Sequence, residues 1–165
     1  VMNLDCEVLE NDSGLRPTSE VMMHIAIYRN RSDVRAIVHT HSIYATTMAI
    51  LDKPIPAVVY EVANLGLSQA RIPVAPYARP GTPELAKSVG QAVQEADCVL
   101  LEKHGAVAVD GRDIYEAYLK AAYIEGLAEL YHHSLTANFG KEPPVFEQSE
   151  LERWEYPKEI TFPRK

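Results

Sequence analysis

The sequence has little cysteine, no long apolar run and no excess of positive charge. Two cysteines among 165 residues, Cys6 and Cys98, are too few for a disulfide-stapled fold and are typical of a reducing cytoplasm. No apolar stretch approaches the roughly 20 residues that span a bilayer. Lys and Arg number 16 against 23 Asp and Glu, giving a net charge of -7, and the basic residues are scattered. We therefore expect a cytoplasmic protein that binds neither nucleic acid nor membrane.

The rest of the composition is that of an ordinary globular protein. Hydrophobic residues make up 47% and charged residues 24% of a chain long enough for one domain with a real core. Helix patterns, read from apolar periodicity and caps, cover residues 21–28, 43–51, 82–95 and 113–135. Strand patterns cover residues 34–41, 97–103 and 106–109, with weaker ones at 1–9 and 57–60. Helices and strands are therefore expected to be interleaved along the chain.

The apolar stretch that begins at Val34 ends in two histidines separated by one residue, His39 and His41. Residues at i and i+2 of a strand project to the same side, so both imidazoles could face one metal ion. Alternatively, they are two histidines at a strand end that only form hydrogen bonds. His104 also follows an apolar strand. Three imidazoles would leave a tetrahedral ion one open position, as in catalytic zinc sites, although copper, nickel and iron also accept imidazole.

The other histidines are weaker candidates for ligands. His132 and His133 are adjacent in the long predicted helix and would point about 100° apart, so we interpret them as surface residues. His24 lies within the first predicted helix and is interpreted as a packed or partly exposed residue. The three residues before that helix, 18–20, also have an ordinary explanation, namely a Thr or Ser N-cap followed by a glutamate that suits the helix dipole.

Five segments together resemble the class II aldolase/adducin family, and within it the L-fuculose-phosphate aldolases. They occur in the family's order over nearly all of residues 1–135, and they are residues 16–20, 36–42, 55–60, 72–82 and 100–105. The resemblance implies a three-layer α/β/α fold with a mostly antiparallel central sheet, usually assembled as a homotetramer. It also implies that His39, His41 and His104 bind zinc.

The same resemblance assigns roles to five further residues. Glu20 matches the family's acidic residue, which acts as the base. Thr18 and Ser19 match hydroxyl residues that help to hold the substrate phosphate. Tyr60 matches a tyrosine that faces a neighbouring subunit's site and can donate a proton. A second such tyrosine lies near the C-terminus in the aldolases, and Tyr156 is the candidate here.

These residue types suit aldol chemistry. A carboxylate such as Glu20 can remove the proton next to a ketone carbonyl that zinc polarises, and a phenol can protonate the alkoxide formed with an aldehyde. In reverse, a phosphorylated ketose is cleaved. The expected function is therefore a zinc-dependent aldolase that cleaves a ketose 1-phosphate, such as L-fuculose 1-phosphate, into dihydroxyacetone phosphate and an aldehyde.

The chain also departs from the family's pattern. Two phosphate-cradle segments that come earlier in the family are missing, and the chain starts at Val1, so we expect a single domain, residues 1–165, that lacks its N-terminal segment. Lys103 replaces the Asn or His common before His104. Three alternatives remain open. They are a pentulose-phosphate 4-epimerase, which tends to carry Asp at the position of Glu20, a sugar-phosphate dehydratase, and a non-catalytic adducin-like interaction module, which need not keep the metal ligands.

Overall fold

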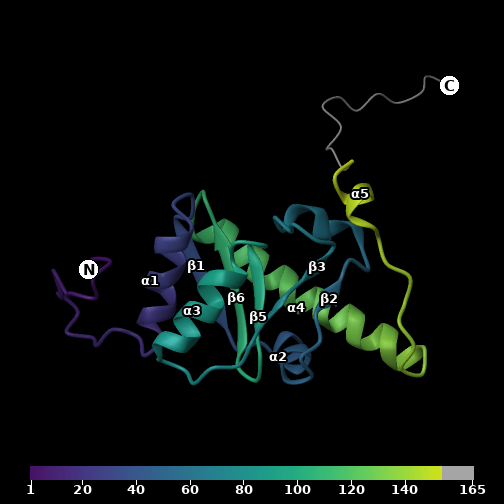
Figure 1. Cartoon of the computed structure of the whole chain (residues 1–165), viewed down its shortest axis with the longest axis horizontal. Coiled ribbons are helices and arrows are strands. Elements are labelled where there is room, and N and C mark those ends of the chain that lie inside the picture. The colour runs from purple at the N-terminus through teal and green to yellow at the C-terminus, as the bar shows by residue number, and fades with distance from the viewer. Residues whose placement is uncertain (154–165) are drawn as a thin grey trace.

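A four-stranded sheet between two layers of helices forms the body of the protein (Figure 1). The computed structural model describes residues 1–153. The helices are α1 (Val21–Asn30), α2 (Ile43–Ile50), α3 (Pro83–Ala92), α4 (Ile114–Ala137) and α5 (Gln148–Leu151), with a 3-10 helix η1 (Tyr60–Asn64). The strands are β1 (Ala36–Thr40), β2 (Ile55–Pro56), β3 (Arg71–Ile72), β4 (Val74–Ala75), β5 (Cys98–Leu101) and β6 (Gly105–Asp110). No helix in this part of the chain is both long and apolar enough for a membrane span.

The central sheet has the strand order β1-β6-β5-β4. β1 and β5 each pair antiparallel with β6, and β4 pairs parallel with β5. A separate antiparallel pair is formed by β2 and β3. The expectation of a mostly antiparallel central sheet is therefore confirmed.

Apolar side chains fill both faces of the sheet. In β6, Val107 and Val109 belong to the core shared with α1 and α3, whereas Ala106 and Ala108 belong to the core shared with α2 and α4. Successive strand residues point to opposite faces, so a strand covered on both sides needs an unbroken apolar run. This pattern produces the expected three-layer α/β/α arrangement.

The predictions of the helices that begin near Thr82 and Asp113 are confirmed, and in the structure both residues cap their helix with a side chain. The hydroxyl of Thr82 accepts a hydrogen bond from the Leu85 amide at 3.4 Å at the start of α3. The carboxylate of Asp113 accepts one from the Glu116 amide at 3.0 Å at the start of α4. Both caps serve the otherwise unpaired amides of a first helical turn.

Three local predictions are wrong. Glu20, not Thr18 or Ser19, occupies the N-cap position of α1, and its side chain makes no capping hydrogen bond. The Thr18 hydroxyl does accept an amide hydrogen bond, but from Glu20 at 3.2 Å, and Glu20 precedes the first residue of α1. Thr18 therefore does not cap the helix. The strand pattern at 57–60 fails because the chain turns there and Tyr60 begins η1. Residues 1–9 form a single bridge rather than a strand.

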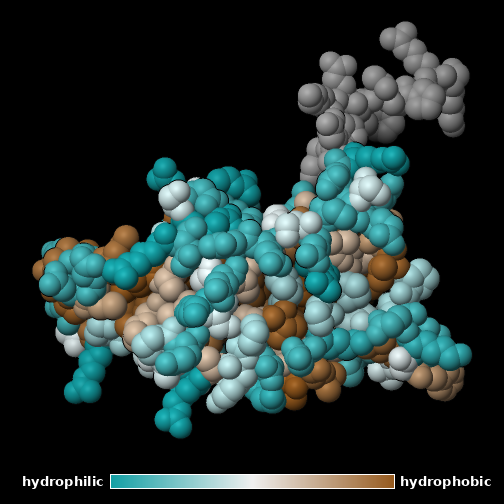
Figure 2. Space-filling model, viewed as in Figure 1, coloured by the Kyte–Doolittle hydropathy of each residue, from teal (hydrophilic) through white to brown (hydrophobic). Residues whose placement is uncertain are grey.

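The N-terminal segment lies at one end of the molecule, beside α1 (Figures 1 and 2). Arg29 of α1 binds it through the Asp5 carboxylate and the Leu4 carbonyl, both at 2.7 Å. Its apolar side chains remain exposed, and they are Val1, Leu4, Val8, Leu9 and Leu15. This segment therefore adds little to the core, which begins at α1.

Candidate metal centre

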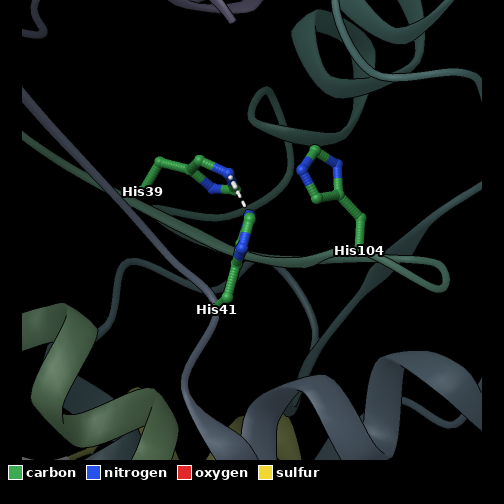
Figure 3. Close-up of side chains that lie close together, drawn as sticks. All are labelled: His39, His41 and His104. Atoms are coloured by element: carbon green, nitrogen blue, oxygen red, sulfur yellow. Dashed lines mark hydrogen bonds between the residues drawn. The ribbon is translucent and has the colours of Figure 1, made fainter.

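The three predicted histidines converge on one point (Figure 3). His39 lies in β1, His41 follows the last residue of β1, and His104 lies in the turn between β5 and β6. One ring nitrogen from each lies within 4.8 Å of the others. The ring centroids are 4.8 to 5.0 Å apart. Three imidazoles at this spacing could hold one metal ion.

Sheet pairing positions the ring of His39. Its backbone pairs with Val107 of β6, and its Nδ1 lies 2.9 Å from the Ala106 carbonyl oxygen. A carbonyl only accepts hydrogen bonds, so Nδ1 is the donor, and in the neutral ring Nε2 keeps the lone pair that a metal needs. This Nε2 lies 3.0 Å from Nε2 of His41.

A close approach between β1 and β6 brings the other two histidines together. A Cβ added at Gly105 would lie 2.3 Å from the Thr40 carbonyl oxygen and 2.8 Å from Cδ2 of His41. Just before it, the amide of His104 donates to the Leu101 carbonyl at 2.9 Å, and Lys103 takes the left-handed backbone conformation with φ 56°. A tight turn followed by glycine therefore presents His104 beside His41.

Burial favours the neutral form of two of the three imidazoles. It lowers the pKa of His39 to about 4, opposed by the hydrogen bond to Ala106 and assisted by the neighbouring His104 and His41. Burial also lowers the pKa of His104, while the charge of Glu20 acts in the opposite direction. A neutral ring is the form that binds a metal.

Glu20 supplies a buried carboxylate to the same region. The residue is 8% exposed, and its Oε2 is buried without a hydrogen-bond partner within residues 1–153, as is Nδ1 of His104. Burying such an oxygen unpaired is costly, so its position needs an explanation. A cation or a substrate hydroxyl at the triad would supply one, and the donor set of three imidazoles fits a divalent transition-metal ion.

The two hydroxyl residues predicted to hold phosphate lie next to Glu20. Both Thr18 and Ser19 are exposed, and the Thr18 hydroxyl accepts the Glu20 amide. The turn at Gly81 packs against them, because a Cβ added there would lie 3.0 Å from the Ser19 carbonyl oxygen. A solvent-facing polar edge therefore borders the buried carboxylate.

The predicted tyrosines lie elsewhere or outside the described structure. Tyr60 begins η1, is 49% exposed, and lines a groove with the C-terminal residues Phe146, Leu151 and Arg153. The three histidines instead lie in or just after β1 and between β5 and β6. The role of Tyr60 at a neighbouring subunit stays a prediction. Tyr156 lies outside the described residues.

His24 has a stronger link to the site than its sequence context suggested. It lies on α1, one turn after Glu20. Burial lowers the pKa of His24, and the charge of Glu20 opposes this effect only in part. His24 in turn contributes to the lowered pKa of His39. The i, i+4 spacing to Glu20 was the available signal. The surface interpretation of the other pair holds for His133, which is exposed, while His132 is half-buried against Tyr44.

Comparisons with known proteins agree with this geometry. Residues 1–132 match the family model described as the class II aldolase and adducin N-terminal domain. The chain is 38% identical over 152 residues to a 5-deoxy-D-ribulose 1-phosphate aldolase of Bacillus thuringiensis serovar kurstaki, which covers 92% of this chain and 67% of that protein. It is 38% identical over 122 residues to an L-fuculose phosphate aldolase of Escherichia coli K12, which covers 74% and 55% respectively.

Solved structures show the same fold. An L-fuculose 1-phosphate aldolase superposes with a TM-score of 0.81 at 36% identity, over 92% of this chain and 67% of that one. An L-fuculose-1-phosphate aldolase from Thermus thermophilus gives a TM-score of 0.64 at 26% identity, over 86% and 76%. The chain thus spans 55% to 67% of the length of the two curated relatives. With most of its length matched by the family model and its three histidines grouped, the chain belongs to the class II aldolase/adducin family.

Proposed function

We propose that the protein is a zinc-dependent aldolase that reversibly cleaves a ketose 1-phosphate into dihydroxyacetone phosphate and an aldehyde. One observation carries this proposal, namely three imidazoles grouped within 4.8 Å, with the buried Glu20 carboxylate close enough for its charge to act on His104 and with one of its oxygens left unpaired among the described residues. A purely structural histidine cluster would not explain why an unpaired carboxylate oxygen is buried nearby at a cost in free energy. An interaction module would need neither feature.

His39, His41 and His104 would hold the ion, with three protein ligands and an open position, as in catalytic zinc sites. The hydrogen bond from Nδ1 of His39 to Ala106 orients that ring. When bound, the cation supplies Lewis-acid polarisation of the substrate carbonyl.

Glu20 would act as the general base and acid. In the condensation direction its Oε2 takes the proton from the carbon next to the carbonyl, and in cleavage it returns that proton to the same carbon. Burial suits this role because it removes competing water from the carboxylate. The Thr18 hydroxyl, which accepts the Glu20 amide at 3.2 Å, helps to hold the base in place.

Thr18 and Ser19 would bind the substrate phosphate. Their exposed hydroxyls border Glu20, so a phosphate there would place the adjoining carbons near the carboxylate. The predicted role of Tyr60 extends the proposal to the assembly. We place this exposed phenol at the site of a neighbouring subunit in a homotetramer, where it protonates the aldehyde-derived oxygen.

Two substrates deserve comparison, because the similar proteins include aldolases for L-fuculose phosphate and for 5-deoxy-D-ribulose 1-phosphate. The test is release of dihydroxyacetone phosphate from each sugar, measured by coupled reduction, together with the metal content of the purified protein. We expect about one zinc per chain and cleavage of at least one of the two. Absence of metal after incubation with zinc would refute the proposal.

Two variants separate the roles. His104→Ala should lose the metal and the activity while the domain stays folded, whereas the matched control His133→Ala, at an exposed position, should keep both. Glu20→Gln should keep the metal but lose exchange of the dihydroxyacetone phosphate proton with deuterated water. Retained exchange in that variant would remove Glu20 from the role of base.

A further inference from the structure

Helix α2 joins the two connections that carry His41 and His104. It begins two residues after His41, so its first turn sets the direction of the chain that leaves the metal centre. Near its other end, the carbonyl of Ala49 accepts the amide of Lys103 at 3.1 Å, immediately before His104. A shift of α2 would therefore be transmitted to both histidines.

The first turn of α2 lacks a local cap. Ser42 occupies the N-cap position with the usual extended backbone, but its side chain makes no capping hydrogen bond. Its hydroxyl instead lies 3.4 Å from that of Thr40. Amides at the start of a helix need an acceptor, and a capping residue normally provides it.

Glu125 of α4 takes the place of that cap. Its Oε1 accepts the amide of Tyr44 at 2.9 Å and its Oε2 accepts the amide of Ala45 at 2.8 Å, from 81 and 80 residues away in the chain. These are the second and third residues of α2, which a local cap would serve. A carboxylate at a helix N-terminus also gains from the helix dipole, and hydrogen bonds to a charged group are the stronger kind.

Helix α4, which carries Glu125, packs closely against the sheet. α4 runs for 24 residues and packs against α2, β1 and β6, so Glu125 projects from a helix fixed to the strands next to the metal centre. Glu125 is half-buried, and Tyr44 is also in contact with the ring of His132, two turns further along α4. Two points of α4 thus hold the first turn of α2.

We propose that Glu125 is a positioning residue of the metal centre, which fixes α2 and through it His41 and the turn that carries His104. This inference rests on the proposed metal site, but it does not depend on the identity of the substrate. Mutation of a residue that orients metal ligands from outside the coordination sphere commonly lowers metal affinity by about 10- to 100-fold. Since Glu125 acts through a helix and not on a ligand directly, we expect the lower end, about tenfold.

The test compares Glu125→Gln with the matched control Glu129→Gln. Glutamine has nearly the shape of glutamate, but one of its two oxygens is replaced by a donor that faces a helix amide. Glu129 lies one turn further along α4 and is exposed; its carboxylate lies 3.8 Å from His133, and among the described residues it accepts no amide of α2. If Glu125→Gln fails to fold, Glu125→Ala removes both acceptors at a position that favours alanine.

Three readouts are taken on the full chain, namely zinc affinity by chelator competition, amide hydrogen exchange of Tyr44 and Ala45, and ring NMR signals of His41 without metal. We expect Glu125→Gln to weaken zinc binding about tenfold, to accelerate exchange at both amides, and to shift the His41 signals. Glu129→Gln should change none of these. Unchanged zinc affinity with accelerated exchange would show that Glu125 serves only the helix, and the proposal would be overturned.

The outcomes also separate this inference from the proposed function. If the wild type binds zinc but cleaves neither sugar phosphate, while Glu125→Gln binds zinc more weakly, the aldolase proposal fails and the positioning role stands. If both proteins bind zinc equally and the wild type cleaves a sugar phosphate, the positioning role fails and the aldolase stands. If the wild type binds no divalent metal, both are overturned.

Discussion

Replacing Gly105 by alanine should damage the metal centre more than any comparable small substitution on the surface. The added Cβ would lie 2.3 Å from the Thr40 carbonyl oxygen and 2.8 Å from the His41 ring. The first of these atoms belongs to the backbone of β1, which is paired with β6 at this point and cannot yield without breaking the pairing. The clash is therefore steric and is directed at both the sheet and a predicted metal ligand.

The cost can be placed on a scale. Overpacking a well-filled interior by a methyl group costs about 1–3 kcal/mol, and a clash with paired backbone belongs at the upper end, about 3 kcal/mol. For a chain of this size, each kcal/mol shifts Tm by about 2–4 °C, so Tm should fall by about 6–12 °C. Zinc affinity should fall as well, because the ring of His41, 2.8 Å from the added Cβ, has to move from its position in the triad.

The matched control is Gly126→Ala in α4, where an added Cβ meets nothing within 4 Å. There alanine should stabilise the helix by roughly 0.5–1 kcal/mol, so the same substitution has the opposite sign. Urea unfolding and zinc titration of both variants provide the measurement. Wild-type stability and zinc affinity in Gly105→Ala would show that the close approach of β1 and β6 is not needed, and the reasoning would be refuted.

Three further predictions concern the metal, the charges and the turn. Chelation should lower Tm, and zinc at 100 times its Kd should restore about 2.7 kcal/mol, a response that His39→Ala should abolish in the same thermal melt. Lys120→Ala should cost about 3 kcal/mol in urea unfolding, because it leaves the buried carboxylate of Asp110 and that of Asp97 without the ammonium at 2.8 and 2.6 Å. Burial raises the pKa of Asp110, but Lys120 and Arg112 lower it more, so the pKa lies below its usual value in the folded protein. The wild type should therefore lose the stability that the Asp110–Lys120 ion pair supplies as pH falls below about 3.9. An equal loss of stability with pH in Lys120→Ala would show that Lys120 is not the cause. Lys103→Gly should stabilise by about 1 kcal/mol, since a left-handed backbone is costly for any residue with a Cβ; a lower urea midpoint in this variant would show that the Lys103 contacts with Glu102 and Tyr77 outweigh the strain.

Local patterns predicted much of the fold because its elements are locally encoded. The caps at Thr82 and Asp113 mark the starts of α3 and α4 through side chains that bond amides three residues away. The unbroken apolar runs mark β5 and β6 because both faces of these strands are covered. The same reasoning failed at 57–60, where the propensity of valine and tyrosine for strands was overridden by the turn into η1.

The sequence by itself indicated which side chains could bind the metal and that two of them, His39 and His41, lie on one face of a strand. The i, i+2 spacing of His39 and His41 predicts a shared face at a strand end, the apolar strand before His104 makes it the third candidate ligand, and the family resemblance adds Glu20. Only the tertiary structure decided that the three histidines meet, because the pairing of β1 with β6 brings His104 close to His41 and His39, which lie 63 and 65 residues earlier in the chain. The close approach at Gly105, the unpaired oxygen of Glu20 and the anchoring of α2 by Glu125 depend on contacts between distant segments, which no local pattern encodes.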